Sequence, residues 1–119
     1  MLSIQVDKNI IYTVAEEKLT DEDYERLVPL LEEKVRSYGK IRWYFEMKEF
    51  EGWSLSAMWR DLKFDFSNNE NLERIAMVGN KNWEKQLTLL MKPFTGATIK
   101  YFDSSEKDEA KNWIKKIEL

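Results

Sequence analysis

Apolar and polar stretches alternate along the chain with periods that predict strands followed by helices. Residues 2–5 and 10–15 are short apolar segments separated by the polar cluster Asp7-Lys8-Asn9, which predicts an antiparallel hairpin. The next apolar positions recur at a helical period: Tyr24, Leu27, Val28, Leu31, Val35 and Tyr38. This helix is expected to end at Gly39.

The start of the first helix carries a capping signal. Thr20 is followed by the acidic residues Asp21, Glu22 and Asp23, which suit the first turn because of the helix dipole. Pro29 falls inside the helical pattern and removes one backbone hydrogen bond. A kink or a break into two segments is therefore expected there.

The rest of the chain predicts three more strand and helix pairs. Residues 41–47 are nearly all apolar, as is typical of a central strand covered on both faces. The elements expected after it are a helix at 55–64, a strand at 74–78, a helix starting at Asn80, a strand at 97–102 and a final helix. Ser105 and Asp108 form a capping-box pattern before the final helix, whose inner stripe is Ala110, Trp113, Ile114 and Ile117.

The predicted order ββαβαβαβα defines the fold class. It indicates an α/β domain with a mostly parallel sheet, an N-terminal antiparallel hairpin and packed helices. The length of 119 residues fits one domain, spanning 1–119.

Composition narrows the class of function. A net charge of −3 argues against general nucleic-acid binding, which depends on Lys and Arg neutralising phosphates. The chain has no Cys and no His, so a disulfide framework, a thiolate zinc site and the commonest general base are all missing. No signal peptide or membrane-spanning run is recognisable, and a cytoplasmic location is expected.

Sequence motifs of catalysis and cofactor binding give no positive support for an enzyme. The chain contains no dinucleotide-binding, P-loop, nucleophile-elbow or H-E-x-x-H motif, so neither a cofactor nor a metal is predicted. Ser104 and Lys107 match S-x-x-K, but the enzymes with that motif need further motifs and a larger fold.

Candidate binding residues gather after the strand at 41–47. Ser54 and Ser56 lie at a predicted helix N-terminus, where they are candidate anion ligands or phosphoacceptors, although Ser54 also suits a simple N-cap. Four aromatics are candidates to line an apolar pocket at the carboxyl end of the sheet, although such aromatics are more often core: Trp43, Tyr44, Trp53 and Trp59. Trp53 is expected in a loop beside Gly52.

A series of carboxylates surrounds the same strand end. Glu46, Glu49 and Glu51 are followed by Asp61 on the predicted helix, and hard cations such as Mg²⁺ use oxygen ligands of this type. Without a recognisable ligand loop, a solvated acidic rim is the expectation.

Several short stretches, in order and spacing, resemble the SpoIIAA-like family of small bacterial and archaeal proteins. They are Gly52-Trp53-Ser54, Ala57, Trp59, Asp61-Leu62, Glu73-Arg74-Ile75-Ala76-Met77-Val78-Gly79, Lys81-Asn82-Trp83, Pro93-Phe94, Tyr101-Phe102 and Glu109-Ala110-Lys111-Asn112-Trp113. The resemblance implies the fold of STAS domains, which act as anti-sigma-factor antagonists or regulatory modules. Residues 51–56 lack the Asp-Ser-Ser-Gly-like motif of the phosphorylated antagonists, which puts a phosphorylation switch in doubt.

Two functions follow as hypotheses. The first is a non-enzymatic regulatory or interaction domain that binds a protein partner near Gly52 to Ser56. The alternative is a carrier of a small apolar or lipid-like ligand, held in the aromatic pocket near the start of the second helix, because the fold is similar to lipid-binding domains of the CRAL-TRIO type. An enzyme that uses only carboxylates and serines, and a homodimer, both stay open.

Overall fold

The computed structural model describes residues 2–53, 72–80 and 98–116. The elements in these ranges are β1 (Leu2–Asp7), β2 (Ile10–Leu19), α1 (Asp21–Tyr38), β3 (Ile41–Trp53), β4 (Leu72–Gly79), β5 (Thr98–Asp103), the short 3₁₀ helix η2 (Ser104–Glu106) and α4 (Lys107–Lys115). The helices expected at 55–64 and after Asn80 lie outside the described residues.

The strands form one mixed sheet in the order β1-β2-β3-β4-β5. β1 pairs with β2 in antiparallel fashion, with Leu2 opposite Ala15 and Asp7 opposite Ile10. The pairs β2–β3, β3–β4 and β4–β5 are all parallel. The predicted α/β class, the N-terminal hairpin and the mostly parallel sheet are therefore confirmed.

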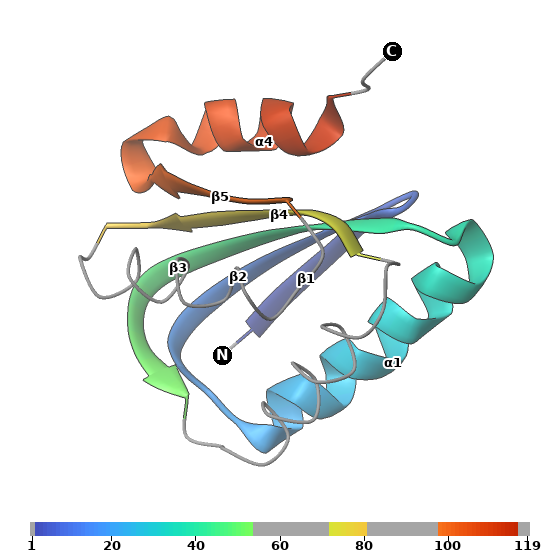
Figure 1. The fold of residues 1–119 in the computed structure, drawn as a ribbon. Coiled ribbons are helices and arrows are strands. Elements are labelled where there is room, and N and C mark those ends of the chain that lie inside the picture. Colours follow the sequence, from blue (N-terminus) through green and yellow to red (C-terminus); the bar gives the residue numbers. More distant parts are fainter. Residues whose placement is uncertain (1, 54–71, 81–97, 117–119) are drawn as a thin grey trace.

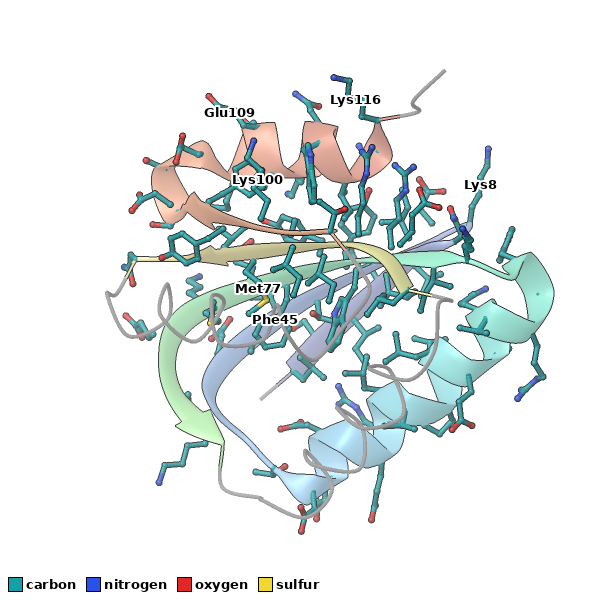
Figure 2. All side chains as sticks on the ribbon, viewed as in Figure 1. Lys8, Phe45, Met77, Lys100, Glu109 and Lys116 are labelled. Carbon is teal, nitrogen blue, oxygen red and sulfur yellow. The ribbon has the colours of Figure 1, made fainter. Side chains whose placement is uncertain are left out.

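Helices α1 and α4 cover opposite faces of the sheet (Figure 1). Residues of β3 alternate between the two faces because successive strand side chains point in opposite directions. Trp43 and Phe45 belong to the core on the α1 side, whereas Tyr44 belongs to the smaller core on the α4 side. Figure 2 shows Phe45 beside its β4 register partner Met77 between the sheet and α1. β3 is thus the central, doubly covered strand that its sequence predicts.

The predicted boundaries of α1 are confirmed. The Asp23 N–H donates to Thr20 Oγ1 at 3.4 Å and the Thr20 N–H donates to Asp23 Oδ2 at 2.9 Å, which completes a capping box. At the other end, Gly39 has a φ of 80° and its N–H donates to the Val35 carbonyl at 2.8 Å. The positive φ explains why a glycine ends this helix.

Two expectations for α1 need correction. The helix continues through Pro29 as one element, so of the two expected alternatives the break into two segments does not occur, and the kink stays a prediction. Pro29 lies on the exposed side, while Leu27 and Leu31 on either side are fully buried and hold the helix against the sheet. Tyr38 was expected on the apolar face, but its position in the last turn leaves it 50% exposed.

Strand β3 is longer than its apolar run predicts. It extends to Trp53 and stays paired with β2, with Lys18 opposite Gly52 and Leu19 opposite Trp53. The expectation that Trp53 lies in a loop is therefore wrong. The backbone ladder continues past Met47 because irregularities in register, centred on Glu17, absorb the extra residues of β3.

The start of the last helix uses a different cap from the one predicted. Asp103, and not Ser105, forms a capping box, and it caps the 3₁₀ helix η2 that precedes α4: its Oδ1 accepts from the Ser105 N–H at 3.1 Å, and Glu106 Oε1 accepts from the Asp103 N–H at 3.2 Å. The N-cap of α4 itself is Glu106, which makes no side-chain cap hydrogen bond. The hydrogen bonds from the Ser105 backbone and hydroxyl lower the pKa of Asp103. The segment thus begins as a short 3₁₀ turn and continues into α4.

Candidate functional site

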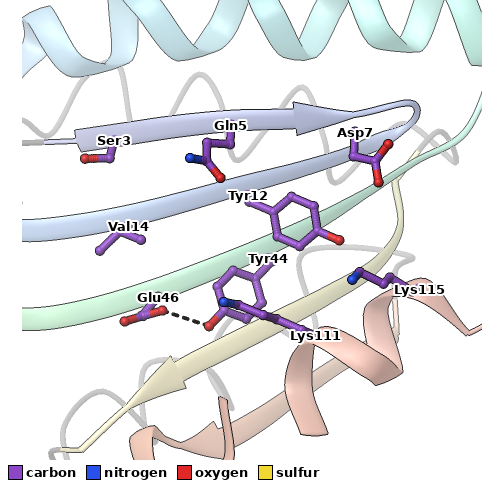
Figure 3. A pocket seen from close by; sticks show the side chains of 9 residues that line it. All are labelled: Ser3, Gln5, Asp7, Tyr12, Val14, Tyr44, Glu46, Lys111 and Lys115. Carbon is purple, nitrogen blue, oxygen red and sulfur yellow. Dashed lines mark hydrogen bonds between the residues drawn. The ribbon is translucent and has the colours of Figure 1, made fainter. Parts of the chain in front are cut away.

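An open pocket of about 370 Å³ lies between α4 and the first two strands (Figure 3). It forms because α4 packs on β3, β4 and β5, which leaves the same face of β1 and β2 without cover from this helix. The pocket is lined by Ser3, Gln5, Asp7, Tyr12, Val14, Tyr44, Glu46, Lys111 and Lys115. Its volume is within the range of small-ligand sites.

Two tyrosines form the floor of the pocket. Tyr12 on β2 and Tyr44 on β3 are register partners, and their ring centroids lie 5.7 Å apart at an interplanar angle of 50°. Burial is the main cause that raises the pKa of each hydroxyl, with a further contribution from Asp7 at Tyr12 and from Glu46 at Tyr44. Both hydroxyls are therefore neutral hydrogen-bond donors at neutral pH.

Glu46 is a buried carboxylate at one side of this floor, with an exposed fraction of 8%. The Tyr44 hydroxyl donates to its Oε1 at 2.8 Å, and Lys107 Nζ lies 3.3 Å from its Oε2. The prediction of a solvated acidic rim is wrong for Glu46, because the strand turns this side chain under the start of α4. Glu49, by contrast, is exposed.

The Tyr12 hydroxyl oxygen is buried and has no hydrogen-bond partner among the described residues. An unsatisfied buried polar atom is uncommon, because desolvation costs about 1–3 kcal/mol when no partner replaces water. Since Tyr12 lines the pocket, this unpartnered hydroxyl lies beside the space that a bound molecule would fill.

Lys111 and Lys115 form the α4 wall of the pocket, one helical turn apart (Figure 3). Lys111 Nζ lies 5.8 Å from the centroid of the Tyr44 ring, within the range of a cation–π contact. Neither lysine forms an ion pair with another described residue. This wall therefore carries positive charge that the surrounding protein does not neutralise directly.

Two arginines on the sheet fix the C-terminal end of α4. Arg42 Nη1 donates to the carbonyls of Ile114 at 2.8 Å and Lys116 at 2.6 Å. Arg74 Nη1 donates to the carbonyls of Trp113 at 2.9 Å and Lys116 at 3.2 Å. Carbonyls in the last turn of a helix lack intrahelical partners, so these bonds satisfy them and hold the lysine wall in place.

The structure places only part of the predicted site. Trp43 is in the core on the α1 side, and its indole N–H donates to Thr13 Oγ1 at 2.9 Å, so it does not line the pocket. Gly52 and Trp53 are described as backbone at the end of β3. Ser54, Ser56 and Trp59 lie outside the described residues.

Of the pocket residues, Tyr44 was among the predicted pocket aromatics and Glu46 among the predicted rim carboxylates. Tyr12, Lys111 and Lys115 were not predicted, although two signals existed in the sequence. Lys111 and Lys115 stand four residues apart, on one side of the predicted last helix. Tyr12 alternates with Ile11 and Thr13 in a predicted strand, which assigns it to the opposite face. Neither signal shows that the two surfaces meet, because that depends on where the last helix crosses the sheet.

In the part of the chain that the structure describes, no group of three or more Asp or Glu side chains is placed to hold a metal ion. Lys107, the lysine of the S-x-x-K match, pairs with Glu46. No described helix is long and apolar enough to cross a membrane.

The order and direction of the described strands, with α1 and α4 on opposite faces, define a STAS-type α/β domain. The sequence model of the SpoIIAA-like family matches residues 10–115, and the chain belongs to this family. A crystal structure of an uncharacterized protein from Shewanella loihica with a SpoIIAA-like fold is similar, with a TM-score of 0.73 and 29% sequence identity, over 96% of this chain and 92% of that chain. No curated protein matches the chain.

Proposed function

We propose that this protein is a non-enzymatic cytoplasmic regulatory or interaction domain that binds a protein partner through the segment from Gly52 to Ser56. Membership of a STAS-type family supports the general role. The segment begins within the carboxyl end of β3, a central strand of the parallel part of the sheet, since Gly52 and Trp53 are the last two residues of that strand. Open α/β sheets bind their ligands at this edge.

The observation that carries the proposal is the irregular backbone leading to this segment. Glu17 and Glu49 are non-glycine residues with positive φ values of 59° and 49°. The β2–β3 register shifts beside Glu17, and β3 residues Glu49 and Glu51 have no partner in it. Bulges and positive φ values of this kind are over-represented near functional sites, where the bulge redirects the chain.

Affinity capture followed by mass spectrometry tests the proposal. The bait is the full chain, compared with Trp53→Ala, Ser54→Ala and the control Tyr38→Ala, which removes an exposed aromatic side chain from α1. A partner captured by wild type and by Tyr38→Ala, but lost with Trp53→Ala, supports the segment as the interface. Equal recovery with all variants, each shown to be folded by circular dichroism, contradicts it.

A small-ligand carrier is the second candidate, and the open pocket beside α4 favours it. The aromatic pocket expected near the start of the second helix gains no support from Trp43, which is 5% exposed and hydrogen-bonded in the core. Native mass spectrometry of freshly purified protein separates the two functions, because a carrier retains additional mass that disappears on unfolding.

A further inference from the structure

We propose that the pocket between α4 and the β1–β2 hairpin binds a small organic anion with a planar apolar body. The negative group of the ligand is held by Lys111 and Lys115, and its ring lies against Tyr12. The inference deepens the carrier function by naming a site and a ligand class. It does not depend on the segment from Gly52 to Ser56.

The charges around the pocket favour an anion. The carboxylate of Glu46 already forms an ion pair with Lys107 Nζ at 3.3 Å and accepts a hydrogen bond from the Tyr44 hydroxyl at 2.8 Å. Besides Glu46, the lining residues include one other carboxylate, Asp7 at the end of β1, against the two lysines Lys111 and Lys115. Like charges one helical turn apart repel each other, and an anion bound to both would relieve that repulsion.

The apolar part of the ligand follows from the floor. The half-buried side chains of Tyr12 and Val14 present apolar surface to the pocket, whereas the Tyr44 ring is 1% exposed (Figure 3). Aromatic rings prefer to pack on other rings in offset or tilted arrangements. A bare inorganic anion would leave this surface exposed to water, so the geometry favours a ligand that carries a ring.

The Tyr12 hydroxyl supplies the third contact. Its oxygen is buried and unpartnered within the described ranges, and Tyr12 lines the pocket. A ligand oxygen that accepts its hydrogen bond would satisfy it. The three features together, a cationic wall, a ring floor and one neutral donor, match an aromatic carboxylate better than a cation or an uncharged hydrocarbon.

The test uses naphthoate as the probe, titrated into the full chain by isothermal calorimetry. Naphthol, which has the ring without the carboxylate, and inorganic phosphate, which has the charge without the ring, are the two comparison ligands. Phenyl phosphate replaces the carboxylate by a phosphate on a ring and distinguishes the two sources of negative charge. The variants are Lys111→Gln, Lys115→Gln and Tyr12→Phe.

Lys34→Gln is the matched control. Lys34 Nζ lies 5.9 Å from the Tyr38 ring centroid on α1, a geometry close to that of Lys111 over Tyr44, but on the opposite side of the sheet. Its substitution removes the same charge and the same type of contact without touching the pocket. Any general effect of removing one positive charge from the protein therefore shows in this control.

We expect naphthoate to bind more tightly than naphthol or phosphate. Lys111→Gln and Lys115→Gln should each weaken the affinity for naphthoate about fivefold to tenfold. Tyr12→Phe weakens it by a smaller factor, and Lys34→Gln has no effect. Tighter binding of phenyl phosphate than of naphthoate still supports the site and assigns a phosphate head. The proposal is overturned if naphthoate does not bind at millimolar concentration, if phosphate binds as tightly, or if Lys34→Gln weakens binding as much as the pocket variants.

Discussion

The hydroxyl of Tyr44 donates a 2.8 Å hydrogen bond to Glu46 Oε1, two residues further along the same strand. Both side chains point to the α4 face, and Lys107 at the start of α4 contacts the other carboxylate oxygen. The buried carboxylate thus links strand β3 to the helix. Because Tyr44 is 1% exposed, water cannot easily replace its hydroxyl at Glu46.

Removing this hydroxyl should destabilise the fold. Tyr44→Phe leaves one oxygen of the Glu46 carboxylate without its donor, and the expected loss in the free energy of unfolding is about 1.5–3 kcal/mol, as for hydrogen bonds to charged groups. Urea denaturation measures it. Tyr38→Phe is the control, because Tyr38 is half exposed. A loss no larger than that of the control would show that the hydrogen bond contributes little.

The buried hydroxyls of Tyr12 and Tyr44 predict how stability changes at high pH. Burial raises the pKa of Tyr12 and Tyr44 above the ordinary value of 10.0. Above pH ~10 the unfolded chain therefore releases these protons while the folded chain retains them, so the free energy of unfolding decreases as the pH rises. Urea denaturation between pH 8 and 11 measures the slope.

The control for the alkaline prediction is the double variant Tyr12→Phe, Tyr44→Phe. It lacks both phenols, so its loss of stability above pH ~10 should be shallower than that of wild type, with lysines contributing equally to both. Parallel curves for the two proteins would contradict the raised pKa values.

Much of the fold could be predicted because its signals are local. The hairpin depends on the turn cluster at residues 7–9, and the first helix depends on the Thr20 cap, its apolar period and Gly39. The capping box before the last helix was misplaced, because Asp103 with Glu106, which caps η2, and Ser105 with Asp108 are overlapping patterns two residues apart. The sequence alone does not decide between them.

The pocket could not be predicted because it depends on tertiary placement. Tyr12 and Lys111 come from opposite ends of the chain. They line the same pocket only because α4 packs across β3, β4 and β5. The burial of Glu46 also depends on tertiary placement. Its charge alone predicts exposure to solvent, and it is buried because Lys107 and Tyr44 contact its carboxylate in the fold. Charge in a sequence does not reveal which carboxylates gain partners on folding.

The arginine contacts to the end of α4 predict a local effect. Arg42→Met removes the donors to the carbonyls of Ile114 and Lys116 and should lower the free energy of unfolding by about 2–3 kcal/mol. Amide hydrogen exchange should increase in the last turn of α4 more than in the central strands. Hydrogen-exchange mass spectrometry measures both regions.

Glu73→Gln is the matched control for Arg42. It removes the ion pair at 2.6 Å but leaves the guanidinium on the helix carbonyls, and Glu73 is 36% exposed. A partly exposed ion pair contributes about 0–1 kcal/mol, so a smaller effect is expected. If Glu73→Gln destabilises α4 as much as Arg42→Met, the ion pair and not the carbonyl contacts would hold the helix end.

The unpartnered hydroxyl of Tyr12 predicts a gain in stability on its removal. Tyr12→Phe keeps the ring on the pocket floor and deletes a buried polar atom that has no partner in the described parts of the chain. Because such an atom carries its desolvation cost without a compensating bond, the variant should be more stable than wild type by up to about 1 kcal/mol. Thermal and urea denaturation of ligand-free protein measure the change, with Tyr44→Phe as the opposite case, since its hydroxyl is hydrogen-bonded. If Tyr12 serves ligand binding, Tyr12→Phe should stabilise the free protein and weaken the complex. Equal destabilisation by Tyr12→Phe and Tyr44→Phe would show instead that the Tyr12 hydroxyl has a hydrogen-bond partner.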